Sequence, residues 1–471
     1  MQHRCISAIG GYLPLLRLDR KAAAKALGFA GLGGRGAGYR AVAGWDEDPV
    51  TMAVEATRSL HPAKRLVFAS TSAPFYDRLH ATLAASALHF PVSTRTVDVS
   101  GSRRCATSAL LDALLGSETS IVAAAEKRPV QAGSAIHAGW GDGAAAVAVA
   151  GEGGARLIGH ATRNHDLLDV YSSRDRPTPY AAEERFMKEA AAELISATVA
   201  EACRSADISP DRIKRVAAHE ALAGTWSTVA RRLGIVAPNA SETVERRAGD
   251  IGAAHGIYSL AVALADADPG DVVLLVGFGS GCDALLFVVD GPVPGAAESV
   301  AMLDEGLVLL DYVRFLSLTG TLELDFGVRS EFEQKAQASV IERHGRDTIA
   351  FLGGRDSAGN VQFPKSSIPV RPGATGPEPM SDVRLADMPA SLISVTADRL
   401  NYTPDPPFWF GLVQFEGGAR VLMELTDADE KGFAVGDQLR MRMRIKSYDR
   451  RRGMRTYFWK AAPMVRPVLG D

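Results

Sequence analysis

Four side chains in this sequence have the chemistry to act as a nucleophile or to move a proton: Cys105, His219, Asp250 and His255. A thiolate is a strong nucleophile, and an imidazole exchanges protons near neutral pH. A turn and helix cap are predicted at Gly101 and Ser102, and the apolar segment SALLDALLG follows at 108–116. We therefore expect the Cys105 thiol at the start of a buried helix, where the pKa of a thiol falls. The alternative is a small thiol packed in the core.

His219 is the best-defined candidate, because it follows a strand-like segment, RVAA at 215–218. At a strand end it can act as general base or donate to an oxyanion, and the alternative is a surface histidine. Asp250 lies in the segment AGDIGAAHG at 248–256, where it either caps a helix or acts on substrate. An ionised carboxylate cannot donate a hydrogen bond, whereas one kept neutral by burial can. His255 could supply a donor or simply pack, and His137 is a weaker candidate.

Charge and cysteine spacing exclude several classes of protein. The 471 residues carry a formal charge of −3, which gives no electrostatic reason to expect a nucleic-acid partner. The four cysteines lie far apart, so we expect neither a disulfide framework nor a zinc knuckle. The chain has no apolar run of membrane-spanning length, and its first residues do not read as a signal peptide. These features predict a soluble, cytoplasmic protein that does not enter a membrane.

The first 292 residues alternate short apolar runs with alanine-rich helical stretches, a pattern typical of a layered α/β fold. Two similar cycles, 1–152 and 153–292, suggest an internal duplication, since VAVAG closes the first and LLFVVDG closes the second. Residues 293–381 are predicted to form a helical, charged segment followed by a linker rich in glycine and proline. Residues 382–471 contain five short strand-like runs, which favour a compact antiparallel barrel.

Six segments of the first 290 residues resemble the thiolase superfamily, in the branch of ketoacyl-carrier-protein synthase III and hydroxymethylglutaryl-CoA synthase. They are YLP at 12–14, DEDPVTMAVEA at 46–56, GDGAAA at 141–146, HE at 219–220, GDIGAA at 249–254 and GFGSG at 277–281. The resemblance implies two α/β halves packed as five layers, an active site between them and a homodimer. It also implies a coenzyme A thioester as substrate, with no tightly bound cofactor, and a carbon–carbon bond made or broken beside that thioester.

The sequence departs from this family at three functional positions. Counting from Asp98 places the usual nucleophile at Arg103, two residues before Cys105, and a two-residue slip turns a helical side chain by about 200°. Asp250 stands where relatives carry an asparagine. The segment 70–78 lacks the catalytic glutamate of hydroxymethylglutaryl-CoA synthase. The missing glutamate puts true synthase activity in doubt. Arg103, Asp250 and a ribbon-like segment without cysteine at 353–364 support the rival hypothesis, a non-catalytic member that binds acyl-CoA or a partner subunit.

The last 170 residues resemble the OB-fold proteins that accompany thiolases and carry a zinc ribbon before the barrel. The ribbon-like segment 353–364 contains no cysteine, so we predict no metal there.

Basic residues alternate along one predicted barrel strand and continue into its turn, at Arg440, Arg442, Arg444, Lys446 and 450–452. We expect this basic ridge to be a solvated edge; contact with CoA phosphates or a partner is the alternative. The glycine-rich stretch 28–38 lacks the residues of a phosphate-binding loop and is predicted to be a mobile loop.

Overall fold

A computed structural model gives the fold of this protein. It describes residues 4–28, 37–134, 136–167, 169–173, 175–181, 184–219, 222–322, 345–449 and 452–469. Most of the predicted mobile loop at 28–38 lies outside these residues. Among the helices that are described, none has the length and apolar character needed to cross a bilayer.

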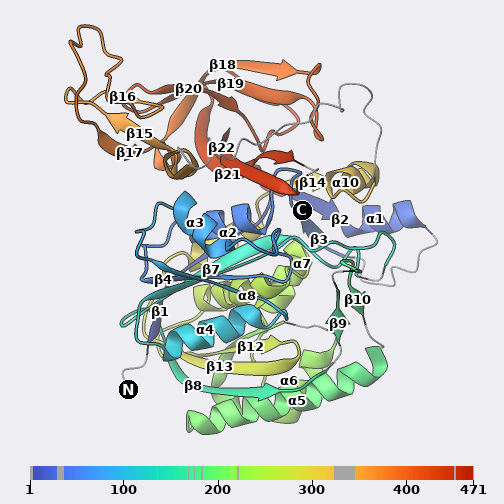
Figure 1. The fold of residues 1–471 in the computed structure, drawn as a ribbon. Coiled ribbons are helices and arrows are strands. Elements are labelled where there is room, and N and C mark those ends of the chain that lie inside the picture. The colour runs from blue at the N-terminus through green and yellow to red at the C-terminus, as the bar shows by residue number, and fades with distance from the viewer. Residues whose placement is uncertain are drawn as a thin grey trace.

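The first half contributes five strands to a nine-stranded sheet, in the order β1-β7-β6-β4-β5. The strands are Cys5–Tyr12 (β1), Arg65–Ala69 (β4), Arg95–Val99 (β5), Ser120–Glu126 (β6) and Gly143–Ala150 (β7). β4 is parallel to β5 and β6, whereas β7 is antiparallel to β6 and β1. Helices Pro49–Thr57 (α2) and His80–Ala87 (α3) cover the outer face of these strands (Figure 1).

The second half repeats the first four places of this order on the other side of the sheet, as β8-β13-β12-β11, with no counterpart of β5 among its described strands. Its strands are Ala155–Asn164 (β8), Ile213–Ala218 (β11), Val272–Phe278 (β12) and Gly281–Val289 (β13). β11 is parallel to β12, and β13 is antiparallel to both neighbours. Helices Glu184–Ser205 (α5) and Thr225–Leu233 (α6) cover the outer face. The matching strand orders confirm the two α/β halves, with β7 and β13 in equivalent places.

Two helices form the central layer between the halves, Cys105–Leu115 (α4) and Ala253–Ala265 (α8) (Figure 1). Every residue of α8 from Ala253 to Leu264 is buried, because strands of both halves pack against it. A helix that is apolar on all sides suits such a position. Helix Ser241–Ala248 (α7) leads into α8. With the two outer helical layers and the two sheet layers, these helices complete the predicted five-layer arrangement.

Short elements surround the five layers. Leu16–Asp19 (β2), Tyr39–Val42 (β3) and Leu307–Leu309 (β14) form a small sheet, and Val170–Tyr171 (β9) pairs with Tyr180–Ala181 (β10). Helices Arg20–Leu27 (α1), Ala296–Leu303 (α9) and Tyr312–Leu318 (α10) accompany them. The helical segment predicted from residue 293 onward is present as α9 and α10 but is interrupted by β14, where pairing with β2 imposes a strand. Residues 323–344 of that segment lie outside the described residues.

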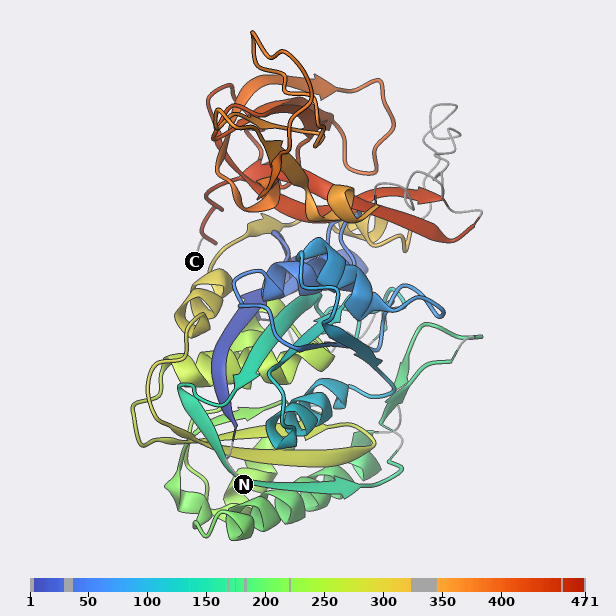
Figure 2. The same ribbon diagram turned by 60° about the vertical axis from the view of Figure 1, so that its left-hand side comes forward.

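The C-terminal region consists of two further sheets, which sit over the α2 side of the molecule (Figures 1 and 2). The first joins Leu352–Arg355 (β15), Val361–Gln362 (β16) and Ser381–Arg384 (β17). The second has the order β20-β19-β18-β21-β22. Its strands are Ala390–Asp398 (β18), Phe408–Phe415 (β19), Arg420–Glu424 (β20), Gln438–Asp449 (β21) and Met454–Pro463 (β22). All five predicted strands are therefore present, and a bridge from Leu425 to Ala461 draws the two edges of this sheet together.

Ion pairs hold the ribbon-like segment where zinc ligands were considered. Arg371 donates to Asp356 at 2.8 Å and to both carboxylate oxygens of Glu378, at 2.8 and 3.0 Å. Asn360 also donates to Asp356. These contacts keep the pKa of Asp356 and that of Glu378 low, each at about 2. Hydrogen bonds thus link the two ends of the connection between β15 and β17.

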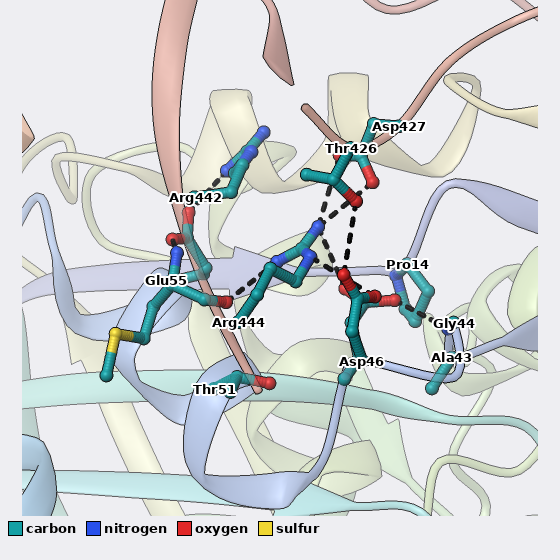
Figure 3. A network of polar contacts seen from close by, with 12 residues as sticks. Pro14, Ala43, Gly44, Asp46, Thr51, Glu55, Thr426, Asp427, Arg442 and Arg444 are labelled. Carbon is teal, nitrogen blue, oxygen red and sulfur yellow. Dashed lines mark hydrogen bonds and ion pairs between the residues drawn. The ribbon is translucent and has the colours of Figure 1, made fainter. Parts of the chain in front are cut away.

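The expectation of a solvated basic ridge is wrong for the middle of β21, because Arg442 and Arg444 are buried against the first half. Arg442 donates to Glu55 on α2, and the backbone N–H of Met443 donates to the same carboxylate at 2.8 Å. Arg444 pairs with Asp46 (Figure 3) and lies 3.2 Å from Glu47. The acidic residues of the segment 46–56 and the alternating arginines of β21 therefore form one interdomain contact.

Candidate active site

Four polar side chains converge where the two halves meet. His219 directly follows β11, and Asp250 precedes α8; His255 lies in the first turn of α8, and Arg103 in the turn before α4. Nε2 of His219 lies 3.2 Å from Oδ1 of Asp250. The rings of His219 and His255 stack at a centroid distance of 4.2 Å. The structure therefore brings three of the four predicted residues together and adds Arg103 in place of the fourth.

Asp250 is held in the ionised state by its neighbours. Its Oδ1 accepts from Arg128 Nη2 at 3.0 Å and from the backbone N–H of Gly252 at 2.7 Å, and Oδ2 lies 3.5 Å from Arg103 Nη1. Burial by itself would raise the pKa of this carboxyl, but the charges of Arg128, His219 and Arg103 hold it well below its usual value. Of the roles considered for Asp250, a hydrogen-bond donor is therefore disfavoured, and an anion that steadies His219 is favoured.

His255 is fully buried and has both ring nitrogens engaged. Its Nδ1 accepts from the backbone N–H of Ile251 at 3.3 Å, so Nε2 carries the proton and faces the Ser241 hydroxyl at 2.7 Å. Burial and the nearby charge of His219 keep its pKa well below the usual value. His255 is thus a neutral ring that packs under His219, and it has no nitrogen left for a substrate.

The structure does not bring Cys105 into this group. Cys105 is the first residue of α4, is 4% exposed and packs among apolar side chains of the central layer. Burial, and then the charge of Glu126, raises the pKa of its thiol far above the usual value. Arg103, two residues earlier, instead points its guanidinium group to Asp250 and Asp169. The two-residue slip in the sequence thus decides which side chain contacts Asp250, the partner of His219.

Arg128 is a residue of the site that sequence reasoning missed. It lies two residues beyond the end of β6, stacks on the indole of Trp140 with its guanidinium carbon 3.6 Å from the ring centroid, and donates to Asp250. A basic pair directly after the apolar strand SIVAAAE was the available signal, since residues that follow parallel strands gather at one sheet edge. Asp169, in the connection between β8 and β9, gave no such signal.

Glu126 places a carboxylate beside the segment that lacks the expected glutamate. It is the last residue of β6, is fully buried, and accepts from the backbone N–H and the hydroxyl of Thr71, both at 2.8 Å. Ser70 and Ser72 donate to its other oxygen. Because several donors saturate this carboxylate, it fixes the loop after β4 rather than offering a free acid.

His137 packs elsewhere, against α10. Its Nε2 lies 2.8 Å from the Tyr312 hydroxyl, and Phe315 packs edge-on against the ring. Burial, with a further contribution from the charge of Arg40, lowers its pKa to about 4. This environment is that of a neutral packing residue.

The histidine–aspartate cluster does not suit a metal ion. His219, Asp250 and His255 offer one ligand atom each within 4.8 Å of one another, and no other such group occurs in the described part of the chain. However, two guanidinium groups already pair with Asp250, and a nearby cation would be repelled by both. A cavity of about 10 Å³ adjoins His219, enough for roughly one water molecule.

Comparisons with known proteins place this site in a recognised fold. The family described as 3-oxoacyl-[acyl-carrier-protein (ACP)] synthase III C terminal matches residues 203–289, which include His219, Asp250 and His255. No curated protein sequence matches the chain.

Three solved structures illustrate the likeness. The 3-oxoacyl-(acyl carrier protein) synthase III of Pseudomonas aeruginosa has a TM-score of 0.54 and 19% identity, over 62% of this chain and 100% of that one. A hydroxymethylglutaryl-CoA synthase complexed with CoA has a TM-score of 0.58 and 17% identity, over 77% and 95%. OleA of Xanthomonas campestris, with bound lauric acid and lauroyl-CoA, has a TM-score of 0.53 and 16% identity, over 61% and 99%. The fold is therefore thiolase-like.

Proposed function

We propose that this protein is an acyl-CoA-dependent enzyme that makes or breaks a carbon–carbon bond next to the thioester, by aldol-type chemistry without an acyl-enzyme. The observation that carries this proposal is that Arg103, and not Cys105, contacts the cluster of His219 and Asp250. A Claisen condensation that begins with acyl transfer needs a nucleophile at this point, and a guanidinium group is not one. An aldol reaction or its reverse needs only a base and donors for an enolate oxygen.

In the cleavage direction, His219 removes the proton from the hydroxyl group on the β-carbon of the acyl chain. The bond between the α- and β-carbons then breaks, and its electron pair moves into the thioester as an enolate. The buried Nη1 of Arg128, which has no partner among the described residues, stabilises the enolate oxygen. The protonated His219, steadied by ionised Asp250, returns the proton to the α-carbon. The products are a carbonyl compound and a shortened acyl-CoA, and condensation is the reverse of these steps.

The likeness to CoA- and acyl-carrier-protein-binding synthases supports a CoA thioester as substrate. We further propose a homodimer, an OB-type barrel for residues 382–471, and a cytoplasmic location with no tightly bound cofactor. The edge strand β5, which pairs only with β4 among the described strands, is available for a second copy.

The test is to incubate the protein with a panel of 3-hydroxyacyl-CoA thioesters and to detect the carbonyl product and the shortened thioester by mass spectrometry. His219→Gln should reduce turnover at least about 100-fold, because it removes the base. His61→Gln, an exposed histidine, is the matched control. Cys105→Ala should retain turnover. Loss of turnover in Cys105→Ala, or an acyl group found on Cys105, would reject the mechanism without an acyl-enzyme.

The second candidate is a non-catalytic thiolase-fold protein that binds acyl-CoA or a partner subunit. Arg103 at the nucleophile position, an ionised Asp250 and the ion-paired ribbon favour it. It predicts that CoA thioesters bind without being turned over, and that His219→Gln leaves their affinity unchanged. Turnover that disappears in that variant would reject it.

A further inference from the structure

Arg103 lies between two carboxylates in the candidate site. Its side chain is 8% exposed, with Nη2 at 2.5 Å from Asp169 and Nη1 at 3.5 Å from Asp250. A buried guanidinium group needs such partners, because an unpaired buried charge costs several kcal/mol. Arg103 therefore requires negatively charged groups beside its guanidinium group.

The two carboxylates are held differently. Asp250 is fixed by Arg128 and Gly252, and its backbone N–H donates to Gly139 at 2.8 Å. Asp169 belongs to the connection between β8 and β9, outside the central layers. Its carboxylate has Arg103 as its one partner within the described part of the chain. Asp169 is thus the partner of Arg103 that another carboxylate could replace most easily.

Replacing Asp169 by a ligand carboxylate preserves the charge of the cluster. The guanidinium groups of Arg103 and Arg128 balance the carboxylates of Asp169 and Asp250, so one anion can exchange for another without leaving Arg103 unpaired. A neutral acyl chain has no group that can compete for this ion pair, since charge-assisted hydrogen bonds are about twice as strong as neutral ones. The buried Nη1 of Arg128 has no partner among the described residues and adds donor capacity nearby.

The position also suits the proposed chemistry. The carboxylate of Asp250 contacts His219 through Oδ1 and Arg103 through Oδ2, so the two side chains flank a single group. A substrate anchored at Arg103 would lie within a few ångströms of the imidazole. An anchor of this kind would replace the covalent attachment that a nucleophilic thiol provides, because it orients the reacting chain.

We propose that Arg103 binds a free carboxylate on the acyl chain of the substrate, in the place taken here by Asp169. The substrates are then CoA thioesters of acids with a second carboxyl group. This inference rests on the proposed function and adds the substrate class.

The test compares glutaryl-CoA with pentanoyl-CoA, which have the same chain length and differ in the terminal carboxylate. Affinities are measured by isothermal titration calorimetry at fixed ionic strength. The protein should bind glutaryl-CoA at least about tenfold more tightly, and Arg103→Gln should abolish this preference. Asp169→Asn removes the internal competitor and should tighten glutaryl-CoA binding at least about threefold, with pentanoyl-CoA unchanged. Arg104→Gln, in the adjacent residue that pairs with Asp283, is the control and should keep the preference.

The possible results distinguish a failure of the carboxylate anchor at Arg103 from a failure of the proposed function. Equal affinity for both thioesters, or weaker glutaryl-CoA binding in Asp169→Asn, would overturn the anchor while leaving the proposed function intact. Binding of neither thioester would reject the proposed function and the anchor together. If Arg103→Gln does not fold, the Asp169→Asn result and the preference of the unmodified protein still decide the question.

Discussion

Buried charges gather in two regions of this molecule, the candidate site and the interdomain contact. At the site, Arg103 and Arg128 face Asp169 and Asp250, and His219 lies beside them. At the interdomain contact the charged residues come from opposite ends of the chain (Figure 3). They are Asp46, Glu47, Glu55, Asp427, Arg442, Arg444 and Lys460.

The two regions differ in the groups that can change their charge. The described contacts of the interdomain region involve carboxylates, arginines, a lysine and tyrosines, and arginine pairs lower the pKa of Glu55 despite its burial. Such a set keeps its charges at neutral pH and fastens one domain to the other. The site has in addition the imidazole of His219, a group suited to general acid–base chemistry, and the carboxylate of Asp169 from a peripheral connection. The candidate site therefore differs from the interdomain contact in having a histidine among its buried ion pairs.

The largest expected effect is a loss of folding stability when an arginine of the interdomain contact is replaced. Arg444→Met leaves Glu47 and Asp427 buried without their main cation, so the free energy of unfolding should fall by about 3–5 kcal/mol. Urea denaturation measures it. Arg156→Met, in an exposed pair with Asp290, is the control and should cost at most about 1 kcal/mol. A small effect of Arg444→Met would show that the interdomain ion pairs do not hold the two parts together.

The next largest effect is a loss of activity that we expect for a substitution in the candidate site and not for one in the interdomain contact. Asp250→Asn removes the anion that steadies a protonated His219, and kcat/KM on a cleaved 3-hydroxyacyl-CoA should fall at least about 100-fold. Steady-state kinetics with the product assay measures this fall. In contrast, Glu424→Gln in the interdomain contact should change kcat/KM less than about threefold in the folded protein. Equal losses in both variants would remove the functional distinction between the regions.

A pH prediction uses the histidines that are held neutral. The pKa of His137 is lowered to about 4, so between pH 6.5 and 4 the unfolded chain binds a proton at this residue and the folded protein does not. Stability should therefore fall as the pH is lowered through this window. His255, whose pKa is also lowered, contributes in the same direction.

His137→Gln should reduce the slope of unfolding free energy against pH between pH 6.5 and 4, with the His255 contribution remaining. Urea denaturation at several pH values measures the slope. An unchanged slope would show that His137 is not kept neutral by its surroundings, and would leave carboxylates of the two charged regions as the source of acid sensitivity.

The smallest effect concerns the ion pairs of the ribbon-like segment, which are more exposed than either buried region. Arg371→Gln breaks the contacts to Asp356 and Glu378 and should lower the free energy of unfolding less than Arg444→Met does. It should increase hydrogen exchange in residues 356–378. A metal chelator should leave the melting temperature of the unmodified protein within about 1 °C, because arginine takes the place of a cation there. A large drop with chelator would contradict this account.

The sequence by itself determined the layered α/β halves and the five C-terminal strands, because hydrophobic periodicity reports which face of each element is buried. It also placed His219, since a polar residue directly after an apolar strand lies at a sheet edge. The slip between Arg103 and Cys105 was visible as well, because helical rotation follows from residue spacing alone.

Only the tertiary structure decided which side chains face one another. The carboxylate that pairs with Arg103 comes from Asp169, 66 residues away along the chain, and the basic ridge of β21 is buried because α2 brings Glu55 to it. A strand with alternating arginines looks the same in a sequence whether water or a partner covers it. Contacts between distant segments depend on how whole elements pack, and no local pattern encodes that packing.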